Sequence, residues 1–265
     1  MSSFFLMPYQ RFNIGMWGKR SFVISYNMDG PDHTLMIFSN SYEVEIPGGL
    51  KGYTVGSIGK LVSLQNKPLI YKKALSAASQ VLIHKTLHQN TNEVYFDDYG
   101  DSSDDESLKS MIAGYLFGPG ELNIFERLYI YIHLSDIVSS KSTRILVTSQ
   151  KPDVKIFEKS FRNERKLVQL IYRTSSKTGY ELASMLENNG IRVADILEYS
   201  PTSTDLAEYA KNGVEKCLII ESSPTFSKTS DFLSSYFGCE KIYGETGLYN
   251  IKLILDEKTE KEWGS

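Results

Sequence analysis

The residues best suited to chemistry lie in the loop 173–179, which leaves an expected strand and enters an expected helix. The loop combines two cations with a run of hydroxyls. A helix N-terminus offers unpaired backbone N–H groups and a partial positive charge, which favour phosphate and other anions. Ligands of open α/β sheets also bind beyond the C-terminal ends of the strands. The candidate anion-binding residues are Arg173, Ser175, Ser176, Lys177 and Thr178.

The same loop has a simpler interpretation as the turn that caps the following helix. Thr178 and Glu181 have the spacing of a reciprocal capping box, which would occupy the amides that an anion needs. The Gly-x4-Gly-Lys-Ser/Thr pattern of a P-loop is missing. The loop loosely resembles the Ser/Thr-rich phosphosugar loop of sugar isomerase domains. Both interpretations, a cap and an anion site, stay open on the sequence alone.

A second candidate site is the segment 155–166, where aromatic residues alternate with cations. Aromatic rings stack on unpaired bases and cations attract the phosphates, so the pattern is typical of single-stranded nucleic-acid binding. Two phenylalanines four residues apart equally fit the buried side of a linking helix, with Glu158 and Glu164 balancing the charge. The residues that would bind nucleic acid are Phe157, Lys159, Phe161, Arg162 and Arg165.

Metal and cofactor sites are not expected. His84 and His88 lie four apart on an expected helix, but no third ligand is identifiable, so a packed or solvent-facing pair is favoured. His33 and His133 form no constellation with other residues, and the Gly-x-Ser-x-Gly motif is absent. The acidic run 97–106 lacks the spacing of a calcium-binding loop, so a solvated loop is expected. The sequence predicts no cofactor and no metal, and it leans away from an enzyme.

The compartment is inferred from the cysteines and from the N-terminus. Cys217 and Cys239 are expected to be buried thiols rather than a disulfide. Only four consecutive apolar residues occur within the first seven, too few for a signal peptide, and no stretch is long enough for a membrane span. The sequence therefore predicts a cytoplasmic or other reducing intracellular compartment, without secretion and without membrane binding.

The last hundred residues contain a repeated unit in which a helix ends in glycine and a strand follows at once. Glycine tolerates the left-handed backbone that ends a helix. Repeated helix–strand units predict parallel strands with helices packed on them, which makes residues 161–265 a two-layer or three-layer α/β domain. The expected strands are 166–172, 191–199 and 216–221, the expected helices are 179–189, 204–212 and 230–237, and a β hairpin is expected at 241–255.

Residues 1–160 are expected to form a separate α+β part. Three antiparallel strands, 21–26, 34–38 and 42–46, include a turn at 27–32 that is rich in Asn, Asp, Gly and Pro. A glycine-rich connection at 47–59 leads to a helix at 69–88. Two shorter helices, 107–117 and 121–135, are separated by the breaker Gly118-Pro119-Gly120, and a strand follows at 144–148.

The C-terminal part resembles the anticodon-binding domain of class II aminoacyl-tRNA synthetases. The stretch 179–193, a helix, a glycine and a strand, carries the resemblance, together with 206–221. Membership would imply binding of RNA or protein in an accessory or synthetase context. Residues 1–160 contain no recognisable class II catalytic motif, so aminoacylation itself is not expected.

Composition narrows the function without fixing it. Apolar residues make up 41% of the 265 residues and the net charge is -3, which is ordinary for a globular protein and excludes a broadly cationic nucleic-acid surface. The best expectation is a non-catalytic accessory or assembly subunit that binds a protein or RNA partner, within a larger complex. The alternatives are an α/β enzyme or binding protein for a phosphate-bearing small molecule at 173–179, and a structural component of a virion or another large assembly.

Overall fold

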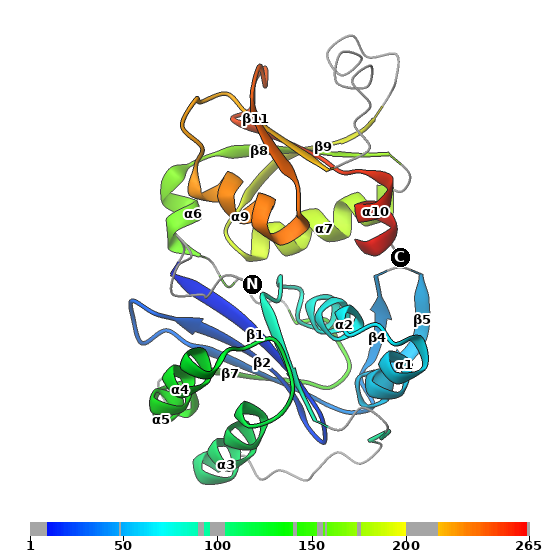
Figure 1. The fold of residues 1–265 in the computed structure, drawn as a ribbon, viewed down its shortest axis with the longest axis vertical. Helices are drawn as coiled ribbons and strands as arrows, with labels where there is room; N and C mark the ends of the chain where they lie inside the picture. Colours follow the sequence, from blue (N-terminus) through cyan, green and yellow to red (C-terminus); the bar gives the residue numbers. More distant parts are fainter. Residues whose placement is uncertain are drawn as a thin grey trace. The chain divides into compact units, whose positions relative to one another are not determined.

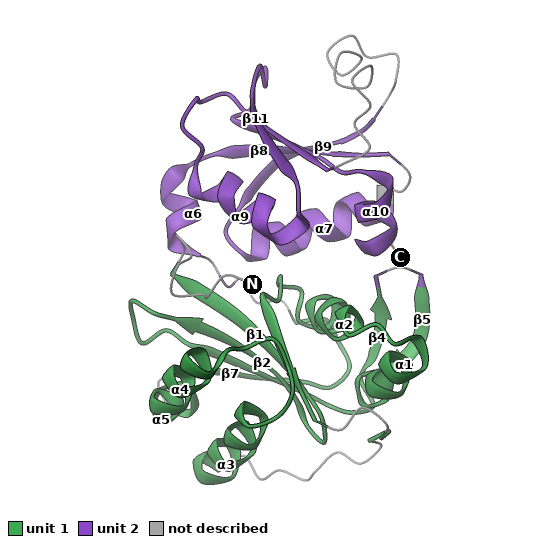
Figure 2. Ribbon diagram, viewed as in Figure 1, with its two compact units in different colours: residues 1–46, 50–154 green, residues 47–49, 155–265 purple. Residues whose placement is uncertain are grey.

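The chain is a mixed α/β protein, seen here in a computed structural model (Figure 1). The structure describes residues 10–47, 49–89, 93–95, 104–139, 142–152, 156, 158–173, 176–199 and 217–263. It divides into two compact units, with residues 1–46 and 50–154 in unit 1 and residues 47–49 and 155–265 in unit 2 (Figure 2). The boundary predicted from the sequence lies between residues 160 and 161, six residues after this division.

Unit 1 is built on a five-stranded mixed sheet in the order β6-β1-β2-β3-β7. The three central strands are antiparallel, whereas β6 and β7 run parallel to their neighbours β1 and β3. The expected antiparallel pair at 21–26 and 34–38 is confirmed as β2 and β3. The strand expected at 42–46 pairs instead with a neighbour in a separate two-stranded sheet, β4-β5. The strands are β1 (Arg11–Trp17), β2 (Ser21–Asn27), β3 (Thr34–Phe38), β4 (Glu43–Ile46), β5 (Leu50–Thr54), β6 (Lys85–His88) and β7 (Thr143–Val147).

Helices cover both faces of this sheet, with α2 on one side and α3, α4 and α5 on the other (Figure 1). The helix expected at 69–88 ends at Ser79, because Gln80 takes a left-handed backbone and the chain then enters β6. A helix that the sequence did not predict, α1, begins at the end of the glycine-rich connection and continues beyond it. The helices are α1 (Ile58–Gln65), α2 (Leu69–Ser79), α3 (Asp105–Leu116), α4 (Ile124–Ile132) and α5 (Leu134–Val138).

The glycine at position 59 has a packing role. Trp17 is fully buried, and its indole N–H donates to the Val55 carbonyl at 2.7 Å. A Cβ at Gly59 would lie 1.9 Å from the Trp17 ring, so only glycine lets α1 pass this side chain. Composition alone had marked this glycine as part of a connection.

A buried ion pair attaches α4 to the edge strand β6. Lys85 Nζ donates to both carboxylate oxygens of Glu126, at 2.7 and 2.8 Å, and the Glu126 side chain is completely buried. The same carboxylate accepts the Asn123 N–H at 2.9 Å, and Asn123 Oδ1 accepts the Glu126 N–H at 3.0 Å, which is a reciprocal capping box. One side chain thus starts the helix and fixes its orientation.

Unit 2 contains a second five-stranded mixed sheet, in the order β11-β10-β12-β8-β9. The prediction that β8 and β9 are adjacent and parallel is confirmed. The prediction for the third strand is wrong, because β12 lies between β10 and β8 and runs antiparallel to β10. The expected hairpin at 241–255 is also wrong, since its two strands flank β10. The strands are β8 (Leu167–Tyr172), β9 (Arg192–Glu198), β10 (Leu218–Glu221), β11 (Glu240–Tyr243) and β12 (Ile251–Ile254).

The described helices of unit 2 lie on one face of this sheet (Figure 1). The helix α7 packs on β8 and β9, and α9 packs on β10 and β11. The helix expected at 204–212 lies outside the described residues. The helices are α6 (Lys159–Glu164), α7 (Ser176–Asn188), α9 (Lys228–Phe237) and α10 (Glu257–Trp263).

The two cysteines of the chain form a disulfide, so the prediction of two thiols is wrong. Cys217 directly precedes β10 and Cys239 directly precedes β11, and these strands are parallel neighbours. Their Cα atoms lie 4.5 Å apart, within the range that a disulfide spans. The pairing of β10 with β11 creates this proximity across 22 residues of sequence.

We expect Lys85→Met to lower the free energy of unfolding of unit 1 by about 3–5 kcal/mol, because Glu126 then stays buried without its cation. The double variant Lys85→Met/Glu126→Gln removes both charges and should recover most of this loss. Urea denaturation, followed by Trp17 fluorescence in a Trp263→Phe background, measures both. Equal losses in the single and double variants would contradict this account of the ion pair.

Removal of the disulfide should destabilise unit 2. The unfolded chain of a Cys217→Ser/Cys239→Ser variant gains conformational freedom, so we expect a loss of about 2–4 kcal/mol. Denaturation followed by Trp263 fluorescence in a Trp17→Phe background measures this loss. Alkylation of the unfolded, unreduced protein should give an intact mass without added groups, and two alkylated cysteines would refute the disulfide.

Candidate functional site

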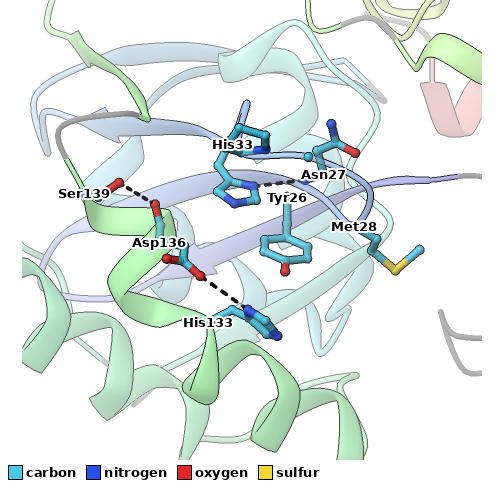
Figure 3. Close-up of a pocket in the computed structure, with 9 residues that line it drawn as sticks. Tyr26, Asn27, Met28, His33, His133, Asp136 and Ser139 are labelled. Atoms are coloured by element: carbon cyan, nitrogen blue, oxygen red, sulfur yellow. Dashed lines mark hydrogen bonds and ion pairs between the residues drawn. The ribbon is translucent and has the colours of Figure 1, made fainter.

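A pocket of about 330 Å³ opens in unit 1 where β2 ends, β3 begins and α4 meets α5 (Figure 3). Two histidines from segments a hundred residues apart line this pocket, together with a tyrosine and an aspartate. Its lining residues are Tyr26, Asn27, Met28, Gly30, Pro31, His33, His133, Asp136 and Ser139.

The turn between β2 and β3 positions His33. The sequence predicted this turn from its composition, and the antiparallel pairing of the two strands confirms it. Asn27 Oδ1 accepts the Asp29 N–H at 3.1 Å, and Arg11 Nη2 donates to the carbonyl and the carboxylate of Asp32 at 2.7 and 2.8 Å. The His33 carbonyl accepts the Thr143 N–H at 3.0 Å, which ties the residue to the start of β7.

His33 is held as a neutral hydrogen-bond donor. Its Nδ1 accepts the Asn27 N–H at 3.2 Å, so the proton of the neutral ring resides on Nε2. Burial lowers the pKa of His33, and the nearby Arg11 cation lowers it further, although Asp136 and Asp32 act in the opposite direction. The imidazole of His33 is therefore neutral near pH 7 and can donate a hydrogen bond from Nε2.

His133 carries the second imidazole and lies between two helices. It ends α4 and begins α5, so the interruption of the helical backbone falls at this residue. Its Nδ1 lies 3.4 Å from Asp136 Oδ2, three residues further on (Figure 3). A carboxylate that accepts the Nδ1–H of an imidazole orients the ring and leaves its Nε2 unprotonated, where it can act as a base. The pair has the arrangement of a general base and its orienting acid.

Tyr26 lies between the two imidazoles. Its ring stacks on His33 with centroids 4.5 Å apart, and it lies 6.0 Å from the ring of His133. Its hydroxyl is 3.4 Å from that of Tyr129 on α4. Burial and this hydrogen bond raise the pKa of Tyr26, so it is a neutral phenol at physiological pH. The pocket therefore combines a neutral donor, a phenol and an oriented base.

His33 and His133, which were expected to form no constellation, both line this pocket. The local signals were present: a turn precedes His33, and His133 has an aspartate at the i+3 spacing. Their convergence depends on the packing of α5 against β3 and of α4 against α5, which no local pattern reveals.

The predicted anion-binding residues are dispersed around the start of α7. The Arg173 N–H donates to the buried Glu260 carboxylate, and the Arg173 guanidinium lies 4.8 Å from the centre of the Tyr199 ring. Ser176 is the first residue of α7, Lys177 forms an ion pair with Glu181 at 3.8 Å, and Thr178 is buried. Ser175 lies outside the described residues.

The predicted capping box at this helix is wrong, because α7 already begins at Ser176 and Thr178 lies inside its first turn. Anion binding at this loop stays a prediction. The Glu260 carboxylate would compete with a bound anion for the Arg173 N–H, and the sequence did not predict this contact.

The central part of the segment expected to bind nucleic acid forms α6 (Lys159–Glu164). Phe161 is buried and packs against Phe232 of α9 with ring centroids 5.0 Å apart, as the packing alternative describes. Lys159, Arg162 and Arg165 belong to the same helix and its C-cap. Phe157 lies outside the described residues. Nucleic-acid binding by this segment stays a prediction, and the Phe161 ring is not accessible for stacking on a base.

The other histidine pair is not on a helix. His84 precedes β6, where its Nδ1 accepts the Asn13 N–H at 2.9 Å, and its ring stacks on Phe12. Burial lowers the pKa of His84 to about 3. His88 ends β6 and stacks on Tyr71. Within the described ranges, no group of three or more His, Cys, Asp or Glu residues could hold a metal ion.

The acidic run is described only from Asp104 onward, where it forms the start of α3 with Asp104 and Glu106 exposed to solvent. Asp104 Oδ1 accepts the Ser107 N–H at 2.6 Å and caps α3. Asp105 forms an ion pair with Arg144 of β7. The remainder of the run lies outside the described residues.

No protein-family profile and no curated protein matches the sequence. The Lin1025 protein from Listeria innocua matches the structure with a TM-score of 0.34 at 7% identity, over 52% of this chain and 83% of that one. The LytR-CPS2A-psr family protein YwtF (TagT), with bound octaprenyl pyrophosphate lipid, gives 0.33 at 9% identity over 52% and 77%. B. subtilis TagT gives 0.32 at 9% over 52% and 78%. Likenesses with TM-scores this low carry no inference about activity.

The expected resemblance to the anticodon-binding domain is wrong. The sheet of unit 2 lacks the run of adjacent parallel strands on which the resemblance depended, because β12 lies between β10 and β8 and runs antiparallel to β10. The accessory or assembly function and the RNA binding depended on this resemblance, so these expectations are wrong as well. Neither alternative, a phosphate ligand at 173–179 or a structural component of an assembly, accounts for the pocket of unit 1.

The expectation of a cytoplasmic or other reducing compartment is also wrong. It depended on two free thiols, whereas Cys217 and Cys239 are joined. Across the described part of the chain, every helix is too short or too polar to cross a membrane.

We expect His33 to titrate below the ordinary histidine pKa of about 6.5. Arg11→Met should raise the His33 pKa, because it removes the neighbouring cation. Since folding lowers this pKa, the stability contributed by neutral His33 is present above pH ~6.5 and is lost as the pH falls from there through the folded pKa. NMR titration of the His33 Cε1–H measures the pKa, and a value at or above 6.5 would contradict this protonation state.

Proposed function

We propose that unit 1 binds a small oxygen-rich molecule in the pocket of Tyr26, His33 and His133 and catalyses a hydrolysis or group transfer on it. The observation that carries the proposal is that one pocket contains two imidazoles whose Nδ1 atoms have different hydrogen-bond partners. His33 has a lowered pKa and a proton on Nε2, whereas His133 has a carboxylate at Nδ1. A hydrogen-bond donor and a base in the same pocket favour acid–base chemistry.

Each imidazole has a distinct role in this mechanism. Nε2 of His133 takes the proton from an attacking water or hydroxyl while Asp136 stabilises the imidazolium that forms. The Nε2–H of His33 donates to the oxygen on which negative charge develops, and a neutral imidazole does this without repelling other cations. The proton on His133 then passes to the leaving group.

The size and the lining of the pocket favour a small substrate. A volume of about 330 Å³ is at the lower end of the range for ligand pockets. Two imidazoles, a phenol and a carboxylate offer donors and acceptors for a carboxylic or phosphoric ester. The side chain of Met28 adds the apolar part of the lining.

A panel of chromogenic carboxylic esters and phosphate esters tests the proposal. We expect turnover of one class by the wild type and a fall in kcat/KM of about 100-fold to 10,000-fold in His133→Gln, which removes the base. Asp136→Asn should reduce the rate less, because it acts through His133. Ser135→Ala, on the exposed side of α5, serves as the matched control and should keep full activity.

Two outcomes would contradict the proposal. One is the absence of turnover with either class of ester. The other is turnover that survives in both the His133→Gln and the His33→Gln variants, which would place the reaction outside this pocket.

A further inference from the structure

The helix α4 exposes an apolar face to solvent. Its outward residues recur at the i, i+4 and i+7 positions and occupy one side of the helix. A surface helix normally buries such a stripe and exposes its charged residues, whereas α4 turns its apolar stripe toward solvent. Phe117 extends the face, because its ring meets that of Tyr131 edge to face at 6.3 Å. The face consists of Phe117 (83% exposed), Ile124 (70%), Phe125 (73%), Leu128 (55%), Tyr131 (51%) and Ile132 (65%).

The packing of the buried side of α4 fixes this orientation. The inner side of α4 carries Glu126 and Ile130, both buried, and the Glu126 carboxylate is bonded to Lys85. Rotation of the helix to bury the apolar face would expose Ile130 and separate the ion pair. The outward face is therefore a fixed feature of unit 1, and Figure 1 places α4 at the outer edge of this unit.

We propose that the apolar face of α4 binds the same face of a second copy of this chain, giving a twofold-symmetric dimer. A twofold interface brings one patch against itself, so it must be self-complementary. The six side chains that form the face carry no charge, and two copies meet without like-charge repulsion. Two short helices can pack their apolar stripes at the usual separation of about 8–10 Å.

The exposed area suits this partner. Aromatic side chains present about 150–250 Å² each and aliphatic ones somewhat less, so three of each, exposed by half or more, present on the order of 800 Å². A standard stable interface buries about 800 Å² per partner. The face alone therefore approaches the area that a dimer needs, and it exceeds what monomers usually leave in contact with water.

A lipid surface is a poorer match for this face. Amphipathic helices that bind membranes carry Lys or Arg beside the apolar side, where the cations attract anionic headgroups. The cation of α4 is Arg127, and its guanidinium donates to the carbonyls of Leu116 and Leu122 at 2.6 and 2.8 Å, and to that of Gly118. The Arg127 side chain therefore stabilises the turn between α3 and α4. The dimer inference does not depend on the chemistry proposed for the pocket.

Sedimentation equilibrium across about 1–100 µM tests the proposal. We expect the wild type to dimerise and Leu128→Glu to raise the dissociation constant at least 100-fold, because a desolvated carboxylate would face its own copy. Phe125→Lys, at a still more exposed position, is the second variant. Leu248→Glu, in unit 2 and 92% exposed, is the matched control and should leave the dimer intact. Far-UV circular dichroism confirms that each variant is folded.

Two results would overturn the dimer. One is a wild type that stays monomeric at 100 µM, including one that then sediments with phosphatidylcholine vesicles, which would assign the face to a lipid surface. The other is a wild-type dimer that both folded α4 variants retain.

Discussion

The buried ion pair between Lys85 and Glu126 is the constraint on which the functional part of unit 1 depends. Two charges removed from water must find each other and satisfy their remaining hydrogen bonds, or the fold loses several kcal/mol. Glu126 meets this demand with one carboxylate that binds Lys85 and also caps α4. The helix therefore has a single start and a single rotation, and both the pocket and the apolar face follow from them.

The pocket and the apolar face lie on two sides of α4. Tyr129 and His133 border the pocket next to Tyr26, while Phe125 and Leu128 face outward. A side chain that tilts α4 would disturb both. The proposed acid–base chemistry relies on the placement of His133 at the end of α4, so the ion pair contributes to the chemistry at a distance.

In unit 2, carboxylates of the chain itself occupy backbone amides at the helix starts and in the loop before α7. Glu164 accepts the N–H groups of Lys228 and Thr229 at the start of α9, at 2.7 and 2.9 Å, and Glu260 accepts that of Arg173. Backbone amides at these points attract negative charge. What the sequence did not show is that side chains distant along the chain could supply the negative charge.

The sequence by itself determined what depends on neighbours a few residues apart. It specified the turn at 27–32, the break at 118–120, and most strands and helices of both units, because turn propensity, helix stops and periodicity are local. Only the tertiary structure decided which strands are neighbours, and hence the disulfide between Cys217 and Cys239 and the position of β12 between β10 and β8. The convergence of His33 and His133 was also beyond the sequence, since a hundred residues separate them and their approach depends on packing summed over the whole unit.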